Sequence, residues 1–138
     1  MSTTTFGALL RATGLSQVEA AALYGVRIDT VKSWYSGRRR APPDIIGDLA
    51  GLVARMDRAA SEAVAMIRRQ AKAQGAPGTV EMGYARSDAE AISLGYPTAS
   101  AHAMTVALAV GRAHAAGYNV ALVPRGTTLA TAGAHDLA

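Results

Sequence analysis

The stretch that decides the fold, residues 15–37, reads LSQVEAAALYGVRIDTVKSWYSG. Ser16 is followed three residues later by Glu19, a capping-box spacing that predicts the start of a helix. Gly25 predicts its end, because glycine adopts the left-handed backbone that a three-residue turn requires. A second helix is expected to begin near Arg27 and to end at the last glycine of the stretch. The pattern therefore predicts two short helices joined by a tight turn.

The apolar residues of this stretch indicate how the two helices pack. Ala21 is small, which suits close contact between helices, and Val26, Val31 and Trp34 are placed to hold the second helix against the first. The side chains at positions 28, 29, 32 and 33 are then expected to face outward on one side. Spacing, turn and packing residues agree over more than twenty positions, which predicts a helix-turn-helix.

The residues on either side extend the helical pattern. A helix is expected from about Thr5 to Gly14, and Pro43 suits the first turn of a later helix. From Asp44 to Gly75 the sequence predicts a helix of about 30 residues, roughly 45 Å long. Its apolar residues recur at alternating steps of four and three: Ile45, Leu49, Leu52, Met56, Ala59, Ala63 and Met66. This stripe fits either the core of one chain or a seam between two chains.

After Gly78 the pattern changes to short strands and helices. The expected elements are a strand at 79–84, a helix at 87–94, an alanine-rich helix at 99–116 and a strand at 118–123. The predicted fold is mainly α with a small β component: an N-terminal helix-turn-helix bundle and a C-terminal α/β dimerisation domain. The predicted domains are a DNA-binding domain at 1–58, a linker helix with the dimerisation domain at 59–124, and a disordered tail at 125–138.

Composition excludes several classes of function. The chain has no cysteine, which excludes disulfides and thiolate metal sites. Its three histidines, His102, His114 and His135, are too far apart in sequence to suggest a shared metal, and no phosphate-binding loop or Ser/His/Asp set can be placed. We therefore expect no enzyme activity, no metal and no cofactor. We also expect no membrane span, no secretory signal, and a cytoplasmic, nucleoid-associated protein.

The formal net charge of +4 is concentrated in one short segment. Positions 27–40 hold five cations against the single acid Asp29, while the positive and negative charges of the rest of the chain cancel. A focused positive charge is typical of a surface that binds a polyanion. The five cations are Arg27, Lys32, Arg38, Arg39 and Arg40.

Residues 5–55 resemble the phage-repressor helix-turn-helix of the Cro or XRE type, including a Trp34-x-Ser-Gly-Arg ending where that family commonly has Trp-Glu-Asn-Gly. The match departs at Tyr35 and Ser36, which replace an acid and an amide. The C-terminal order of elements resembles a subgroup, the anti-CRISPR-associated (Aca) repressors, which have a dimerising C-terminal domain. The resemblance implies a recognition helix from Arg27 to Ser36 and DNA as the partner.

The resemblance also implies roles for individual residues. Lys32 can donate to guanine O6 or N7, Asp29 can accept from cytosine N4, and Ile28 can pack on a thymine methyl. Two alternatives stay open: Asp29 can merely cap the helix, and the arginine loop can be only solvated. The residues expected to contact bases are Arg27, Ile28, Asp29, Lys32 and Ser33, and those expected to contact phosphates are Gln17, Arg38, Arg39 and Arg40.

The predicted function is a sequence-specific transcriptional repressor that binds an inverted repeat of double-stranded DNA as a homodimer, and the Aca resemblance implies autoregulation of an anti-CRISPR operon. The alternatives are the antitoxin of a toxin–antitoxin pair and an RNA-binding or DNA-packaging adaptor. Two DNA half-sites need two chains, so a dimer surface is required. The residues predicted to form it are Ala59, Ala63, Met66, Ile67, Val80, Met82, Tyr84, Tyr118, Val120 and Leu122.

Overall fold

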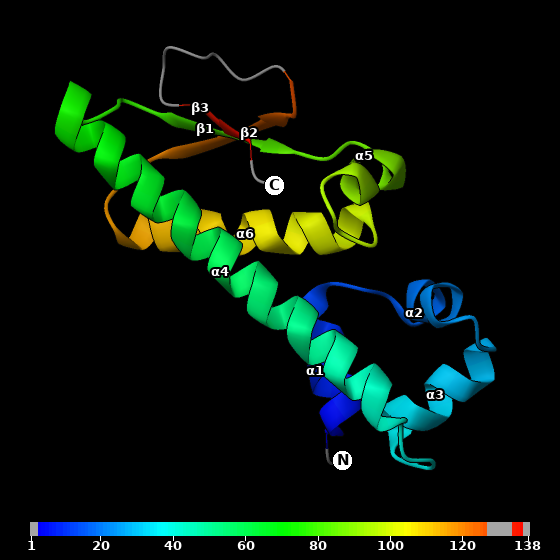
Figure 1. Cartoon of the computed structure of the whole chain (residues 1–138). Helices are drawn as coiled ribbons and strands as arrows, with labels where there is room; N and C mark the ends of the chain where they lie inside the picture. Colours follow the sequence, from blue (N-terminus) through cyan, green and yellow to red (C-terminus); the bar gives the residue numbers. More distant parts are fainter. Residues whose placement is uncertain (1–2, 127–133, 137–138) are drawn as a thin grey trace. The chain divides into compact units, whose positions relative to one another are not determined.

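The structure is a computed structural model that describes residues 3–126 and 134–136 (Figure 1). The described chain is mainly helical with a small parallel sheet, which confirms the predicted secondary-structure class. It divides into two compact units, Met1–Arg55 and Met56–Ala138. The expected boundary at residues 58–59 lies three residues further along, inside the same long helix, α4 (Pro43–Gln74). None of the helices in the described ranges combines the length and apolar character that a membrane crossing requires.

Unit 1 consists of α1 (Thr5–Thr13), α2 (Gln17–Tyr24), α3 (Ile28–Ser36) and the first part of α4. The predicted capping box is confirmed, and α1 is capped as well. Thr4 caps α1 by accepting from the Gly7 amide, and α2 begins with a complete capping box between Ser16 and Glu19. These caps satisfy amides that have no partner within the helix, so each of these short helices has a defined first residue.

The core of unit 1 is built around two aromatic rings. Phe6 of α1 and Trp34 of α3 meet edge to face with their ring centroids 5.5 Å apart. Both rings are almost fully buried, as are Val31 on α3 and Leu49 on α4. Burying one such side chain stabilises the folded state by about 1.5–3 kcal/mol relative to leaving it in water.

The α4 helix matches its predicted length, but its buried stripe differs from the predicted one. Met56 and Ala63 are buried as expected, whereas Met66 is 44% exposed and Ile67 is buried in its place. Ala60 is likewise buried where Ala59 was expected. Leu49, Met56 and Ala63, seven residues apart, all stay buried, but Ala60 and Ile67 lie four positions after Met56 and Ala63 rather than three. Both spacings lie on the same side of an α-helix, and the packing of unit 2 selects the wider one.

Unit 2 contains a three-stranded parallel sheet in the order β2-β1-β3. The strands are β1 (Val80–Tyr84), β2 (Val120–Pro124) and β3 (Ala134–Asp136), and Val80 pairs with Val120 and Met82 with Leu122. Parallel strands need a crossover connection. Here α5 (Asp88–Ser93) and α6 (Ala99–Ala115) form the crossover between β1 and β2. Figure 1 shows α6 and the second half of α4 along one face of this sheet.

The core of unit 2 corrects part of the predicted dimer surface. Ala63 and Ile67 of α4 pack in one cluster with Val80 and Met82 of β1, and none of the four is more than 5% exposed. Small residues of α6 complete the cluster, which lets the helix lie close to the sheet. The apolar pattern of these four residues therefore reflects the core of one chain, and they are not available to a second copy.

The prediction of a disordered tail at 125–138 is wrong where the structure describes this segment. The Arg125 amide donates to the Tyr84 carbonyl at 2.9 Å, and Ala134–Asp136 form β3, which pairs with β1 in parallel. The remainder of the prediction, at 127–133 and 137–138, lies outside the described residues.

Candidate nucleic-acid interface

The turn between α2 and α3 fixes the direction in which α3 leaves. Gly25 has φ +65, in the left-handed region that residues with a Cβ rarely adopt. The Val26 amide donates to the Ala21 carbonyl at 3.0 Å, which closes the turn over the end of α2. Arg27 is the N-cap of α3, and its side chain makes no capping hydrogen bond. Its exposed guanidinium is therefore not used to start the helix.

One face of α3 is exposed and polar. Asp29 and Lys32 are both exposed, as predicted, and Ser36 is exposed beside them. These positions are spaced i, i+3 and i+7, which puts the three side chains on one side of an α-helix. Ile28 is half-buried at the edge of this face. Ser36 was predicted to lie in the recognition helix but not to contact DNA. Its helical spacing from Asp29 and Lys32 could have identified it as a member of this face.

Ser33 does not belong to this face. Its side chain is 2% exposed, and its hydroxyl donates to the Thr30 carbonyl at 2.6 Å. The small side chain satisfies its own polar group by bonding to the preceding turn of α3, so it can be buried at little energetic cost. The prediction that Ser33 faces outward to contact bases is therefore wrong.

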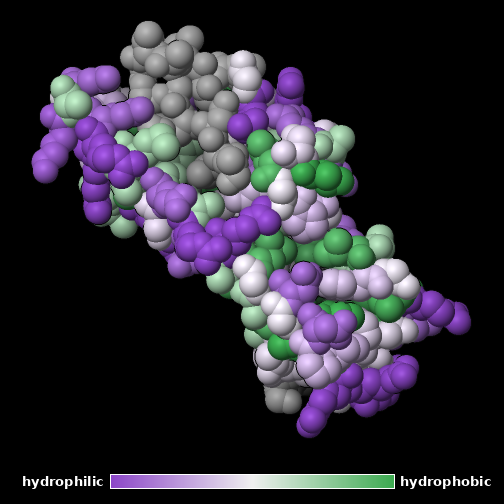
Figure 2. All heavy atoms as spheres, viewed as in Figure 1, coloured by the Kyte–Doolittle hydropathy of each residue, from purple (hydrophilic) through white to green (hydrophobic). Residues whose placement is uncertain are grey.

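The loop after α3 presents three arginines to solvent. Arg38, Arg39 and Arg40 are all exposed, and none of them forms an ion pair with another residue of the described ranges. The Arg39 amide donates to the Ser33 carbonyl at 3.1 Å, which ties the loop backbone to the end of α3. Figure 2 shows hydrophilic side chains gathered at this loop, at the lower edge of the view. The three positive charges lie directly after the exposed face of α3 and are free to meet an anion.

A contact between α1 and α3 was missed by the sequence analysis. Arg11 Nε donates to the Tyr35 hydroxyl at 2.6 Å, and the guanidinium carbon lies 5.4 Å from the centroid of the Tyr35 ring. The Thr4 hydroxyl donates to the Tyr35 carbonyl at 3.0 Å. Tyr35 therefore helps to hold α3 against α1. In the sequence, the only sign of this role was that Tyr35 departs from the motif of the Cro or XRE family, which commonly has an acid at this position.

The other end of the helix pair is held by α2. Gln17, predicted to contact phosphate, is the half-buried first residue of α2. At the last residue of this helix, the Tyr24 hydroxyl donates to Asp48 Oδ2 at 2.7 Å. Burial raises the pKa of the Tyr24 phenol well above its ordinary value, and the acceptor carboxylate of Asp48 raises it further. The phenol therefore remains a proton donor and joins α2 to α4.

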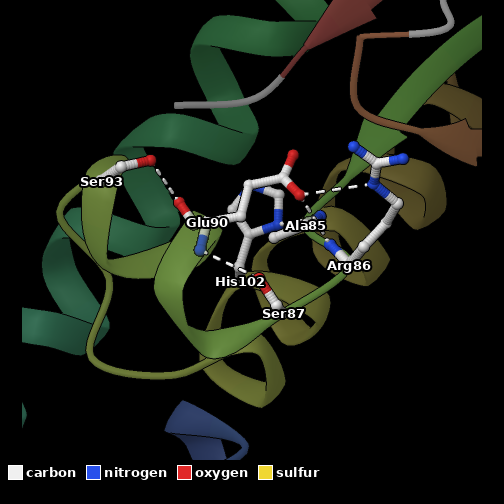
Figure 3. A network of polar contacts seen from close by, with 6 residues as sticks. All are labelled: Ala85, Arg86, Ser87, Glu90, Ser93 and His102. Atoms are coloured by element: carbon white, nitrogen blue, oxygen red, sulfur yellow. Dashed lines mark hydrogen bonds and ion pairs between the residues drawn. The ribbon is translucent and has the colours of Figure 1, made fainter.

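In unit 2 the histidines have different surroundings. His102 is fully buried on α6, and its Nδ1 accepts from the Ala85 amide at 3.2 Å (Figure 3). Its ring also meets the ring of Tyr96 edge to face. His114 is exposed on the same helix, and the side chain of His135 lies outside the description. Within the residues that the structure describes, no three His, Asp or Glu side chains are grouped so as to hold a metal ion.

Beside His102, a short polar network closes the start of α5. Glu90 accepts from the Arg86 amide at 3.2 Å and forms an ion pair with the Arg86 side chain at 3.5 Å, while Ser87 caps the helix (Figure 3). Each of these contacts joins neighbouring positions in the chain, so the network stabilises the loop between β1 and α5.

Comparisons with known proteins add no family: no family model matches this chain, and no curated protein matches its sequence.

Proposed function

We propose that this chain is a sequence-specific DNA-binding repressor of the Cro or XRE helix-turn-helix type, acting as a homodimer on an inverted repeat. The observation that supports it best is the exposed polar face of α3 followed at once by three arginines that form no ion pair with any described residue. In this proposal α3 lies in the major groove, where each base pair presents a distinct set of donors and acceptors.

The two parts of this surface have different tasks. Asp29 and Lys32 contact base edges, because their side chains share one exposed face of α3. The Ser36 hydroxyl on the same face donates to the Ser33 carbonyl and accepts from the Arg38 amide, so it supports the helix end. Arg38, Arg39 and Arg40 bind phosphates, which contributes affinity and register without sequence information. The Arg11–Tyr35 contact keeps α3 at a fixed angle to α1, so that the helix enters the groove in one orientation.

A homodimer is proposed because a single unit makes too few base contacts to select one site in a genome. Two copies related by a two-fold axis contact half-sites about 34 Å apart, one turn of DNA. Of the residues predicted to form the dimer surface, Tyr84, Tyr118 and Val120 are half-buried and pack against the core of unit 2. The surface that remains for dimerisation is the outer strand β2, where Leu122 is 52% exposed, together with the exposed Met66. An outer strand with an exposed apolar side chain is suited to pairing with another chain.

Selection of genomic fragments by the purified protein tests the proposal. We expect enrichment of a few fragments that contain one inverted repeat, and protection of that repeat from nuclease digestion. Uniform recovery of all fragments, or recovery of RNA alone, would reject base-specific recognition and favour an adaptor that binds nucleic acid through phosphates.

Leu122→Asp tests the dimer. A charge on the outer strand should convert the protein to a monomer in light scattering and weaken binding to the full repeat at least tenfold. Ile92→Asp is the matched control, since Ile92 is a comparably exposed apolar residue on α5 (60% exposed). A Leu122→Asp protein that stays dimeric would place the dimer contact elsewhere.

A further inference from the structure

Unit 1 contains a cavity of about 580 Å³ at the junction of α1, α3 and α4. Its walls include Phe6 from α1, Trp34 from α3, Ile46 from α4, and Arg39 and Arg40 from the loop. Cavities that hold small molecules in proteins typically measure about 300–1,000 Å³ and combine apolar walls with a few polar groups. This cavity has the volume of a small-molecule site and the same combination of apolar and polar lining residues.

The inner wall of the cavity is apolar. Phe6 and Trp34 line it and are almost fully buried, and Ile46, which also lines it, is half-buried. The Thr4 hydroxyl, which also lines it, is already occupied, because it accepts from the Gly7 amide and donates to the Tyr35 carbonyl. This wall therefore favours a flat apolar group over a polar one.

The outer wall is positively charged. Arg39 and Arg40 are exposed, and no carboxylate of the described residues forms an ion pair with either side chain. A guanidinium binds a planar carboxylate through two parallel hydrogen bonds, so two such groups at the opening select an anion. Arg38 has the same charge in the same loop but does not line the cavity.

We propose that this cavity binds a small aromatic carboxylate, with the carboxylate on Arg39 and Arg40 and the ring against Phe6, Trp34 and Ile46. A DNA phosphate pairs with the same arginines but has no flat apolar body for the inner wall. If the proposed DNA-binding function holds, on which this consequence rests, the ligand and DNA compete for the side chains of Arg39 and Arg40. Occupancy of the cavity therefore releases the repressor from DNA.

The probe is 2-naphthoate, titrated into the protein without DNA and followed by calorimetry and by the NMR signal of the Trp34 indole, the single tryptophan of the chain. We expect saturable binding that Arg39→Gln and Arg40→Gln each weaken at least tenfold. Arg38→Gln is the matched control and should change the dissociation constant less than twofold. Inorganic phosphate and the neutral 2-naphthalenemethanol should each bind at least tenfold more weakly, because each lacks one of the two features. Circular dichroism checks that all variants are folded.

Absence of saturable binding of 2-naphthoate to the folded wild type overturns the site, as does an equal weakening in the Arg38 variant. If inorganic phosphate binds as tightly as 2-naphthoate, the apolar wall is not used. That result also overturns the proposed site. A second titration uses DNA recovered by the genomic selection: saturating 2-naphthoate should raise the dissociation constant for DNA at least tenfold. An unchanged constant rejects the competition. A protein that binds no DNA rejects the proposed function and with it the competition, while the first titration still decides the site.

Discussion

The arginines of the two units have different partners. In unit 2, Arg86 pairs with Glu90 at the start of α5, and Arg112 joins α6 to α4 by binding Asp57 and the Ser61 hydroxyl. In unit 1, the three loop arginines at 38–40 have no ion pair among the described residues. Arg112 therefore holds two helices of unit 2 together, whereas the three loop arginines of unit 1 remain available to a partner.

The difference indicates a division of labour. An exposed ion pair contributes at most about 1 kcal/mol to stability, so the pairs of unit 2 orient helices more than they stabilise them. Three neighbouring like charges repel one another weakly in water, and a bound anion removes this repulsion. The Arg112 contacts of unit 2 therefore serve packing, whereas the loop of unit 1 is suited to binding, and the following changes test that division.

Met82→Ala should have the largest effect on folding. Met82 is fully buried between the sheet and its helices, so its truncation should lower the free energy of unfolding by about 2–5 kcal/mol in urea titrations followed by circular dichroism. Ile92→Ala is the matched control, because Ile92 is an apolar residue of the same unit that is 60% exposed on α5 and lies outside the proposed dimer surface, and it should cost less than about 1 kcal/mol. Equal effects would mean that Met82 is no better packed in solution than Ile92.

Replacement of all three loop arginines by alanine should weaken binding to every DNA sequence. The slope of log K against log salt should fall by about 0.9 for each phosphate that the variant no longer neutralises. The control removes the same charge from unit 2 by replacing Arg68, Arg69 and Lys72, all on the second half of α4, and should leave the slope nearly unchanged. If both triple variants flatten the slope equally, net charge rather than the loop determines affinity.

Lys32→Ala should affect specific DNA alone. Removal of its hydrogen bond to a base should cost about 1–3 kcal/mol on the selected repeat and little on random DNA, in parallel fluorescence-anisotropy titrations. Ser33→Ala is the matched control on the same helix, because Ser33 is buried, and it should leave the preference for the repeat unchanged. A weaker preference in the Ser33 variant would show that α3 changes its exposed face on binding.

Tyr24→Phe should have the smallest effect. It removes one hydrogen bond to Asp48 and should lower the free energy of unfolding by about 0.5–1.5 kcal/mol at neutral pH. The folded-state pKa of Tyr24 lies above the value of about 10 for an unfolded tyrosine, so its contribution is full below pH 10 and is lost as the pH rises above it. Wild-type stability should therefore fall more steeply above pH 10 than that of the variant. Parallel curves would show that the phenol has an ordinary pKa in the folded protein.

The local elements of this protein could be predicted from its sequence. The capping box at Ser16, the left-handed glycine at position 25 and the proline at position 43 act within a few residues of themselves, so their effect does not depend on the rest of the fold. For the same reason the helices appeared close to their predicted bounds. The clustering of charge at positions 27–40 could also be read from sequence, because formal charge does not depend on packing.

The tertiary structure decided which side chains of each element are buried. Ser33 and Lys32 are adjacent and polar, but only packing determines that the first bonds to its own helix and the second faces solvent. The apolar stripe of α4 was compatible with the core of one chain and with a seam between two chains. It forms a core because the parallel sheet brings β1 against it. The Arg11–Tyr35 contact spans 24 residues of sequence and has no local pattern. Burial is a property of all the elements that meet at a point, so it is decided only when the chain has folded.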